Sequence, residues 1–142
     1  MIGKGSKLYS IFRMKCPRCH VGEMYEDPNP YNLGKLTQMH ASCSHCGEDF
    51  KREPGFFFGA AYVSYALTVA VWIAVLVALL TFDALGWISY TFFEDTLMFF
   101  ASGVITLIVL LPYLYRLSRS LWLNIFIKYE GQNPEFKKPR EF

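Results

Sequence analysis

Four cysteines are the residues in this chain whose type and spacing point most directly to chemistry. They form two C-x2-C pairs separated by twenty-three residues: Cys16 with Cys19, and Cys43 with Cys46. This spacing is typical of zinc ribbons, in which each short loop directs two thiolates at one metal ion. Gly47 follows the second pair and permits the tight turn through which backbone N–H groups approach the sulfurs. We therefore expect these four cysteines to bind one zinc ion.

A site with four thiolate ligands predicts a structural metal rather than a catalytic one. Four protein ligands complete the tetrahedral coordination of zinc and leave no open position for water or substrate. The segment around the cysteines, residues 14–52, is too short to bury a self-sufficient core. We therefore expect the metal to contribute much of its folding free energy, on the order of 10 kcal/mol or more. The protein is accordingly not expected to be an enzyme.

Other interpretations of the cysteines are open. Iron in a rubredoxin-like site uses similar loops and is not excluded by residue type. Residues 16–20 also match the C-x-x-C-H attachment signature of c-type haem, which is installed on the outside of the membrane. A redox pair or disulfide is disfavoured by the reducing cytosol and by the lack of a βαβ pattern. We interpret His20, His40 and His45 as loop or surface residues rather than as ligands.

Two long apolar runs predict that the cysteine segment is attached to a membrane by two transmembrane helices. Of all residues 53% are hydrophobic and 18% charged, and residues 55–82 and 96–115 contain no charge over twenty-eight and twenty residues. About 20 residues are needed to cross the hydrocarbon core as a helix. A buried hairpin in a soluble protein is the alternative, but little chain is left to bury two such runs. The first run starts well inside the chain, so we do not expect a removable signal sequence.

The distribution of basic residues predicts the orientation of these two spans. Eight Lys or Arg precede the first span, six follow the second, and the connecting residues 83–95 contain none. Basic residues accumulate on the cytoplasmic side of membrane proteins. We therefore expect a two-pass protein with both termini in the cytoplasm and an external loop at 83–95.

Small and amphipathic patterns predict how the helices pack. Ala66, Ala70, Ala74 and Ala78 recur at every fourth position and form a face that another helix can approach closely. We expect the second span to be its partner, and a helix of another protein is the alternative.

The segment after the second span has an amphipathic pattern. Residues 116–130 place Leu121, Trp122, Ile125 and Phe126 on one side of a helix. We expect an amphipathic helix in the cytoplasmic interface, or alternatively a docking surface for the metal module.

The expected fold class is therefore membrane α-helical, with a transmembrane hairpin of two helices. Residues 1–54 form a cytoplasmic zinc-ribbon module with short β-hairpins, followed by helix 55–82, loop 83–95, helix 96–115, interfacial helix 116–130 and tail 131–142.

The charge of the module is close to zero. The first 54 residues contain eight basic and six acidic side chains, and a zinc ion with four thiolate ligands adds a net charge of about −2. Nucleic acid is therefore not an expected partner. Neither span contains an ionisable acid, base or histidine, which disfavours a transporter or channel.

The sequence also resembles a known family. The two cysteine pairs, the run from Glu53 to Gly59 (EPGFFFG) and the run from Tyr62 to Leu67 (YVSYAL) resemble the bacterial domain-of-unknown-function 983 family. The resemblance covers most of the chain and implies an inner-membrane protein with a zinc-ribbon-like head and two helices. It implies no catalytic residues. Some relatives are encoded near genes for cytochrome oxidase assembly, which suggests an assembly or accessory role.

Two functional hypotheses follow from these features. The first is a non-enzymatic accessory or scaffold protein that is a subunit or assembly factor of a larger membrane complex. The second is a membrane-bound redox or metal-handling factor that uses the cysteine pairs, for example in the assembly of a respiratory oxidase. The expected partners are the lipid bilayer and a larger complex or a second copy of the chain, and no small-molecule substrate is evident.

Overall fold

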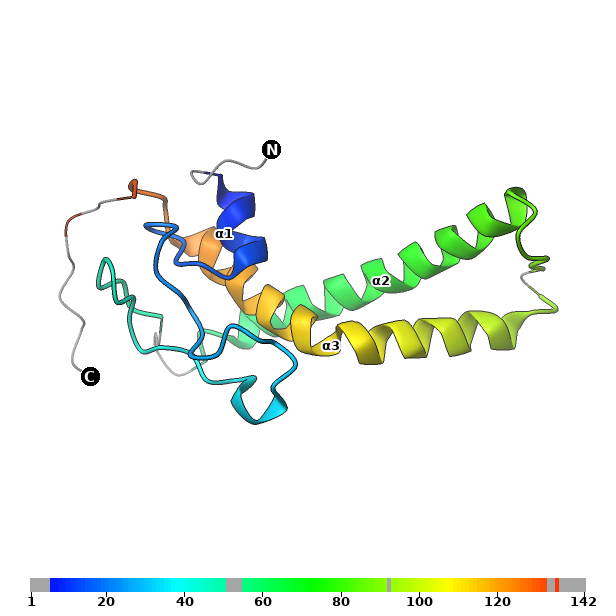
Figure 1. Cartoon of the computed structure of the whole chain (residues 1–142), viewed down its shortest axis with the longest axis horizontal. Coiled ribbons are helices and arrows are strands. Elements are labelled where there is room, and N and C mark those ends of the chain that lie inside the picture. The colour runs from blue at the N-terminus through cyan, green and yellow to red at the C-terminus, as the bar shows by residue number, and fades with distance from the viewer. Residues whose placement is uncertain (1–5, 51–54, 92, 133–134, 136–142) are drawn as a thin grey trace.

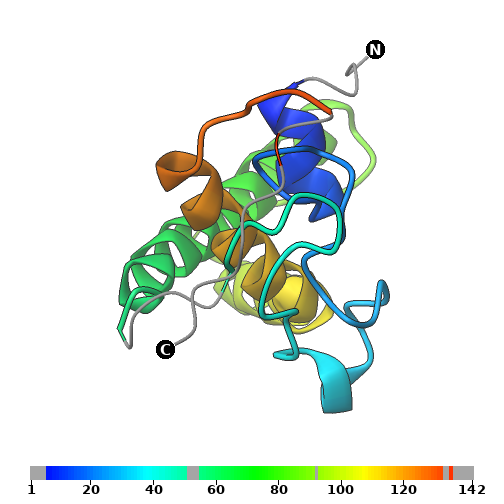
Figure 2. The same cartoon turned by 90° about the vertical axis from the view of Figure 1, so that its left-hand side faces the viewer.

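The fold is a long helical hairpin with an irregular head at one end (Figure 1). The computed structural model describes residues 6–50, 55–91, 93–132 and 135. Helix α1 (Lys7–Arg13) and the short 3-10 helix η1 (Leu33–Lys35) belong to the head, and α2 (Phe58–Ala84) and α3 (Thr96–Phe126) form the hairpin. The head wraps the C-terminal part of α3, and the end-on view in Figure 2 shows its loops gathered around that helix.

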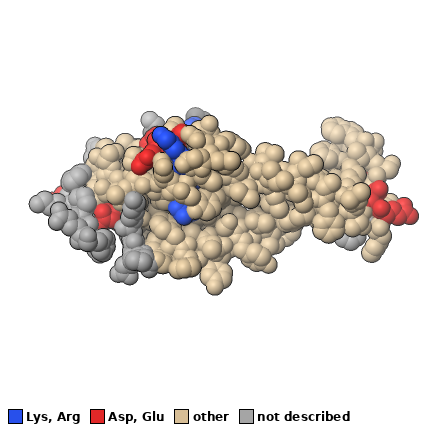
Figure 3. Space-filling model, turned by 90° about the horizontal axis from the view of Figure 1, so that it is seen from below, with Lys and Arg blue, Asp and Glu red and all other residues tan. Residues whose placement is uncertain are grey.

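Helices α2 and α3 are both long and apolar enough to cross a membrane. Only 6% and 17% of their most apolar windows are buried inside the protein, so the rest of the chain does not cover them as it would the core helices of a soluble protein. On the face drawn in Figure 3 the hairpin carries charged side chains only towards its two ends. The two candidate spans indicate a membrane protein, and the structure in this respect agrees with the two apolar runs of the sequence.

The hairpin is held by tryptophan packing on glycine rather than by the alanine face. The Trp72 ring of α2 lies against Gly103 of α3, and it also contacts the rings of Phe99 and Phe100 with centroids 5.2 and 5.8 Å away. In contrast, Ala66 and the alanines four and eight residues later are exposed. The expectation that this alanine face packs against the second span is therefore wrong. The large ring of Trp72 fills the space between the helices and selects a different face of α2.

The structure shows one continuous helix where the sequence predicted two. Helix α3 runs from Thr96 to Phe126 through Pro112, so residues 116–126 continue the second span without a break. Much of this continuation is buried, including Leu117 and Leu123. The alternative of a docking surface for the metal module therefore describes this segment better than a separate helix in the membrane interface.

The expected β-hairpins of the head are absent from the described residues. Three isolated antiparallel bridges take their place: Lys15 with Glu23, Tyr25 with Met39, and Ser42 with Asp49. The bridged residues lie eight, fourteen and seven positions apart, and none of these three bridges extends into a ladder. The tail beyond residue 135 and the basic pair Lys51 and Arg52 lie outside the described residues.

Candidate metal centre

Two similar loops present the four cysteines. In the first loop the Cys16 N–H donates to the Gly22 carbonyl at 2.8 Å, and the His20 N–H donates to the Cys16 carbonyl at 2.8 Å. In the second, the Cys43 N–H donates to the Glu48 carbonyl and the Gly47 N–H donates to the Cys43 carbonyl, both at 2.9 Å. The fourth residue after the leading cysteine has a left-handed backbone in both loops, with φ 58° and 70°. The predicted role of Gly47 follows from this turn, which His20 adopts in the first loop at a steric cost.

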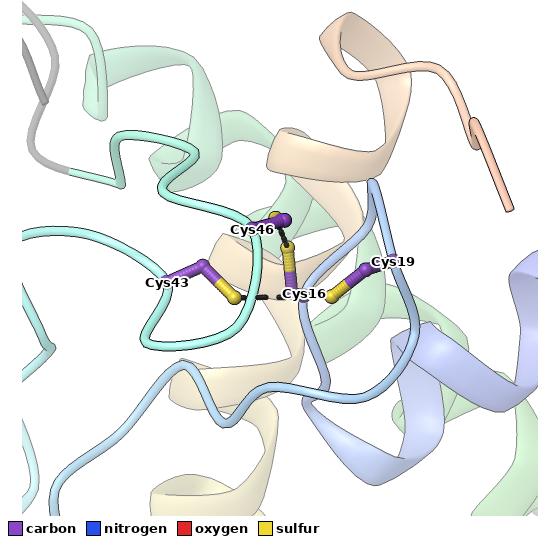
Figure 4. A group of neighbouring side chains, drawn as sticks. All are labelled: Cys16, Cys19, Cys43 and Cys46. Atoms are coloured by element: carbon purple, nitrogen blue, oxygen red, sulfur yellow. Dashed lines mark hydrogen bonds between the residues drawn. The ribbon is translucent and has the colours of Figure 1, made fainter. Parts of the chain in front are cut away.

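The two loops bring all four sulfurs together in the interior of the head (Figure 4). The Sγ atoms lie within 4.8 Å of one another, with 3.6 Å between Cys16 and Cys46 and 3.8 Å between Cys19 and Cys43. A tetrahedral zinc with Zn–S bonds of about 2.3 Å separates its sulfurs by about 3.8 Å. The thiols are free, since a disulfide would need about 2.05 Å. The cluster therefore could bind a metal ion, and its soft thiolates suit zinc or iron.

The thiols influence one another's protonation because they are buried in contact. The hydrogen bond with Cys43 raises the pKa of the Cys16 thiol, and burial adds to the increase. The same hydrogen bond lowers the pKa of the Cys43 thiol to about 4, because the Cys43 thiolate accepts the bond from Cys16. Burial raises the pKa of Cys46 to about 12. Contact within the cluster thus lowers the pKa of Cys43, whereas the pKa values of Cys16 and Cys46 are raised.

Arg18 ties the first loop to the second loop and to the segment that follows α3. Its guanidinium donates to the Cys46 carbonyl at 3.2 Å and to the Glu130 carboxylate at 2.7 Å. The Glu130 N–H returns a hydrogen bond to the Arg18 carbonyl at 3.0 Å, and Tyr129 stacks on the His20 ring with centroids 4.1 Å apart. Arg18 therefore lies directly beside the second cysteine loop and holds the segment after α3 against it. Lys15 lies in an ion pair with Glu23 instead.

The histidines do not join the sulfur cluster. Among the residues that the structure describes, the candidate metal-binding group consists of the four cysteines alone. His20 is buried at the rim of the first loop, and His40 and His45 are exposed. This arrangement agrees with their interpretation as loop and surface residues.

Helix α3 completes the core around the sulfurs. Leu123 is fully buried and Ile127 is 5% exposed, and both belong to the same apolar cluster as the four cysteines, Met24 and Phe50. Sequence reasoning did not assign this role to them. The signal was present, because Leu123 and Ile127 are the apolar residues that do not fit the amphipathic pattern of residues 116–130.

Arg116 joins the loop between the cysteine pairs to the end of the membrane helix. Its side chain is fully buried and donates to the carbonyls of Asp27 at 2.6 Å, Lys35 at 3.1 Å and Leu36 at 3.2 Å. The guanidinium also lies over the Tyr25 ring, 4.5 Å from its centroid. A planar guanidinium can bind three carbonyls at once, which a lysine cannot do in the same geometry. One indication of this role is visible in the sequence, because Arg116 is the first charged residue after the apolar run.

Fold and site together define a class of membrane protein, in which a compact four-cysteine head is built on the end of a two-helix hairpin. Within that class, the chain belongs to the family described as Protein of unknown function (DUF983), whose model matches residues 34–126. The match contains the second cysteine pair and both candidate spans and begins after the first pair. The resemblance found in the sequence is thereby confirmed. No curated protein and no solved structure matches the chain significantly.

Proposed function

We propose that this protein is a non-enzymatic accessory or scaffold subunit of a larger membrane complex, with a structural zinc site in its head. The observation that carries the proposal is that the cysteine cluster and the end of the membrane helix share one buried core. The four cysteines are 0–1% exposed and Leu123 of α3 packs among them. A metal bound there fixes the shape of the head relative to the membrane rather than meeting a substrate.

Zinc is the proposed metal because the cluster offers four thiolates and no additional ligand position. A closed tetrahedral sphere of this type is characteristic of structural zinc sites. The same closure argues against the alternative function, a redox or metal-handling factor. Transfer of metal or of a disulfide requires a reactive and accessible thiol, and these sulfurs are buried. Iron would give a coloured site that absorbs visible light and would favour the alternative.

Capture from native membranes tests the scaffold function. The tagged protein is crosslinked in membranes and purified in mild detergent, and its partners and metals are measured in the same sample. We expect one zinc per chain and a stoichiometric membrane-protein partner. Recovery of the chain alone would contradict the scaffold function, and readily exchangeable metal would favour metal handling.

We further propose that the protein lies in the bacterial inner membrane with both termini and the head in the cytoplasm. The support is the charge distribution, since all fourteen Lys and Arg lie before the first span or after the second. Fusion of the C-terminus to a fluorescent protein that folds only in the cytoplasm is expected to give fluorescence. Activity of a C-terminal alkaline phosphatase fusion, which requires export, would contradict this orientation.

A further inference from the structure

Two apolar segments of the head are exposed to the outside of the protein. On α1, Leu8 and Phe12 are 52% and 51% exposed and lie one helical turn apart. In the loop around η1, Tyr31 and Leu33 are 54% and 71% exposed. Figures 1 and 2 show α1 and η1 on opposite sides of α3. Exposed apolar groups of this size, in so small a module, indicate a surface that contacts something other than water.

The contacts of α1 place it beside the end of the second span. The Tyr113 hydroxyl donates to the Phe12 carbonyl at 3.4 Å, and Tyr113 belongs to the turn of α3 that precedes its first charged residue, Arg116. The Ser10 hydroxyl donates to the Asn124 side-chain oxygen at 3.2 Å, about three turns further along α3 than Tyr113. At 100° per residue, Leu8 and Phe12 are each about 160° around the helix from Ser10. Their face is therefore turned away from Asn124, and the Phe12 carbonyl lies at the level of Tyr113, where the span ends.

The loop around η1 is fixed at the same level by Arg116. This residue is the first charged residue after the apolar run, so it marks the boundary of the span. Its guanidinium binds the carbonyls on both sides of the loop tip, at Asp27 and at Lys35. The exposed Tyr31 and Leu33 therefore project from a loop that is anchored at the membrane boundary.

The charges around the two segments match an anionic lipid surface. Lys7, Arg13 and Lys35 are exposed and flank the apolar residues. The acidic group nearest the loop tip, Asp27, turns its oxygens to the Asn29 N–H and the Asn32 amide at 2.8 and 2.7 Å. Basic groups close to a membrane that contains anionic lipid are attracted to its surface.

We propose that α1 and the loop of residues 29–35 lie in the headgroup region of the bilayer, one on each side of α3. Leu8, Phe12, Tyr31 and Leu33 insert among the lipids, and Lys7, Arg13 and Lys35 contact anionic headgroups. Apolar side chains with flanking cations are the pattern of interfacial segments. The head then rests on the membrane through two lateral contacts and the helix end, which prevents it from tilting about α3.

Spin labels on the full-length protein in nanodiscs with anionic lipid test this arrangement. The label is attached through an unnatural ketone amino acid, which leaves the cysteines untouched, at position 12, 33 or 21. Val21 is the matched control: it is 44% exposed and apolar, but its neighbour His20 stacks on Tyr129, beyond the end of α3. We expect positions 12 and 33 to collide more with oxygen than with a water-soluble nickel complex, and position 21 to show the reverse. Equal nickel access at all three positions would overturn the proposal.

Two further measurements keep the result decisive. Protection of positions 12 and 33 from both oxygen and nickel would show that a protein surface covers them, and it would also overturn the proposal. Nanodiscs of zwitterionic lipid alone are expected to shift both positions towards nickel access, since the basic groups lose their partners. For the unmodified chain, a lipid with a photoreactive group near its headgroup is expected to crosslink peptides from α1 and residues 29–35. Crosslinks confined to α2 and α3 would contradict the proposal.

Discussion

Gly22 lies so close to the sulfur cluster that it has no room for a side chain. A β-carbon at this position would lie 2.3 Å from the Cys43 Sγ. We expect Gly22→Ala to push that sulfur out of position and to weaken metal binding by roughly 10- to 100-fold, as changes next to metal ligands do. Competition with a chromophoric zinc chelator measures the loss.

Gly34 provides the matched control for this substitution. A β-carbon there would meet nothing closer than the Asn32 side chain at 3.7 Å, which is an ordinary contact. Gly34→Ala is therefore expected to leave metal affinity unchanged. Equal affinities of the two variants would show that the position of the Cys43 sulfur does not limit binding.

Protonation of the thiols predicts how metal binding depends on pH. The pKa of Cys16 is raised by its hydrogen bond with Cys43 and that of Cys46 is raised to about 12 by burial, so both thiols hold protons at neutral pH. Metal must displace these protons. Apparent affinity is therefore expected to rise with pH and to fall on acidification, and binding should release at least the two protons of Cys16 and Cys46.

Calorimetry in buffers of different ionisation enthalpy counts the released protons. The pKa of Cys43 is lowered to about 4, so this thiol adds no proton at neutral pH. A Cys46→Ser variant, which lacks one of the protonated thiols, is expected to release fewer protons than the unaltered protein. Metal affinity that stays constant between neutral and mildly acidic pH would contradict the thiolate site.

At the scale of the elements, the contact between Trp72 and Gly103 sets how α2 and α3 pack. A β-carbon at Gly103 would lie 2.2 Å from the Trp72 ring. We expect Gly103→Ala to destabilise the hairpin by about 1–3 kcal/mol, because the rigid ring cannot move without separating the helices. Unfolding in a detergent titration measures this loss.

A second substitution identifies the cause of that loss. Replacement of the ring by a smaller side chain, Trp72→Leu, makes room for the new methyl group, so the double variant should lose less than the sum of the two single losses. Additive losses would show that α2 and α3 do not depend on this contact.

The elements differ in how far the sequence could predict them. Length and the absence of charge were sufficient for α2 and for residues 96–115 of α3, because the requirement for crossing a bilayer is local to each run. They did not predict that α3 continues to Phe126. The alanine face was wrongly assigned, because spacing reveals which residues share a face but not which face a large ring such as Trp72 selects. The β-hairpins were predicted from the ribbon-like spacing of the cysteines, whereas the described residues around those loops form single bridges.

At the scale of the whole molecule, the sequence predicted which cysteines come together but not what surrounds them. The two loops are local structures, so C-x2-C spacing was sufficient for Cys16, Cys19, Cys43 and Cys46. The contacts of Leu123 with the cluster and of Arg116 with the 27–36 loop join residues about eighty or more positions apart. No local pattern encodes such pairs. The head therefore depends on α3 in a way that only the assembled structure shows.

This dependence leads to a prediction for the metal-free protein. The head between residues 15 and 50 is too short to be stable through its own core. We therefore expect its fold to rely on a bound metal, on Leu123 of α3 and on Ile127, which follows α3. We expect removal of zinc by a strong chelator to increase hydrogen exchange of residues 15–50. Residues 58–84 and 96–112 should keep their slow exchange in detergent, because their backbone hydrogen bonds are internal to each helix.

Hydrogen exchange in the C-terminal turns of α3 shows whether the head also stabilises this helix. The exchange of these turns increases on metal removal only if the folded head protects them. Residues 116–126 pack against the head, so we expect their exchange to increase together with that of the head when the metal is removed. Zinc should restore protection in both segments, whereas magnesium should not, because it prefers oxygen ligands. Slow exchange of residues 15–50 after complete metal removal would show that the head folds without the ion. Faster exchange of the head alone would show that α3 supports the metal site without receiving support in return.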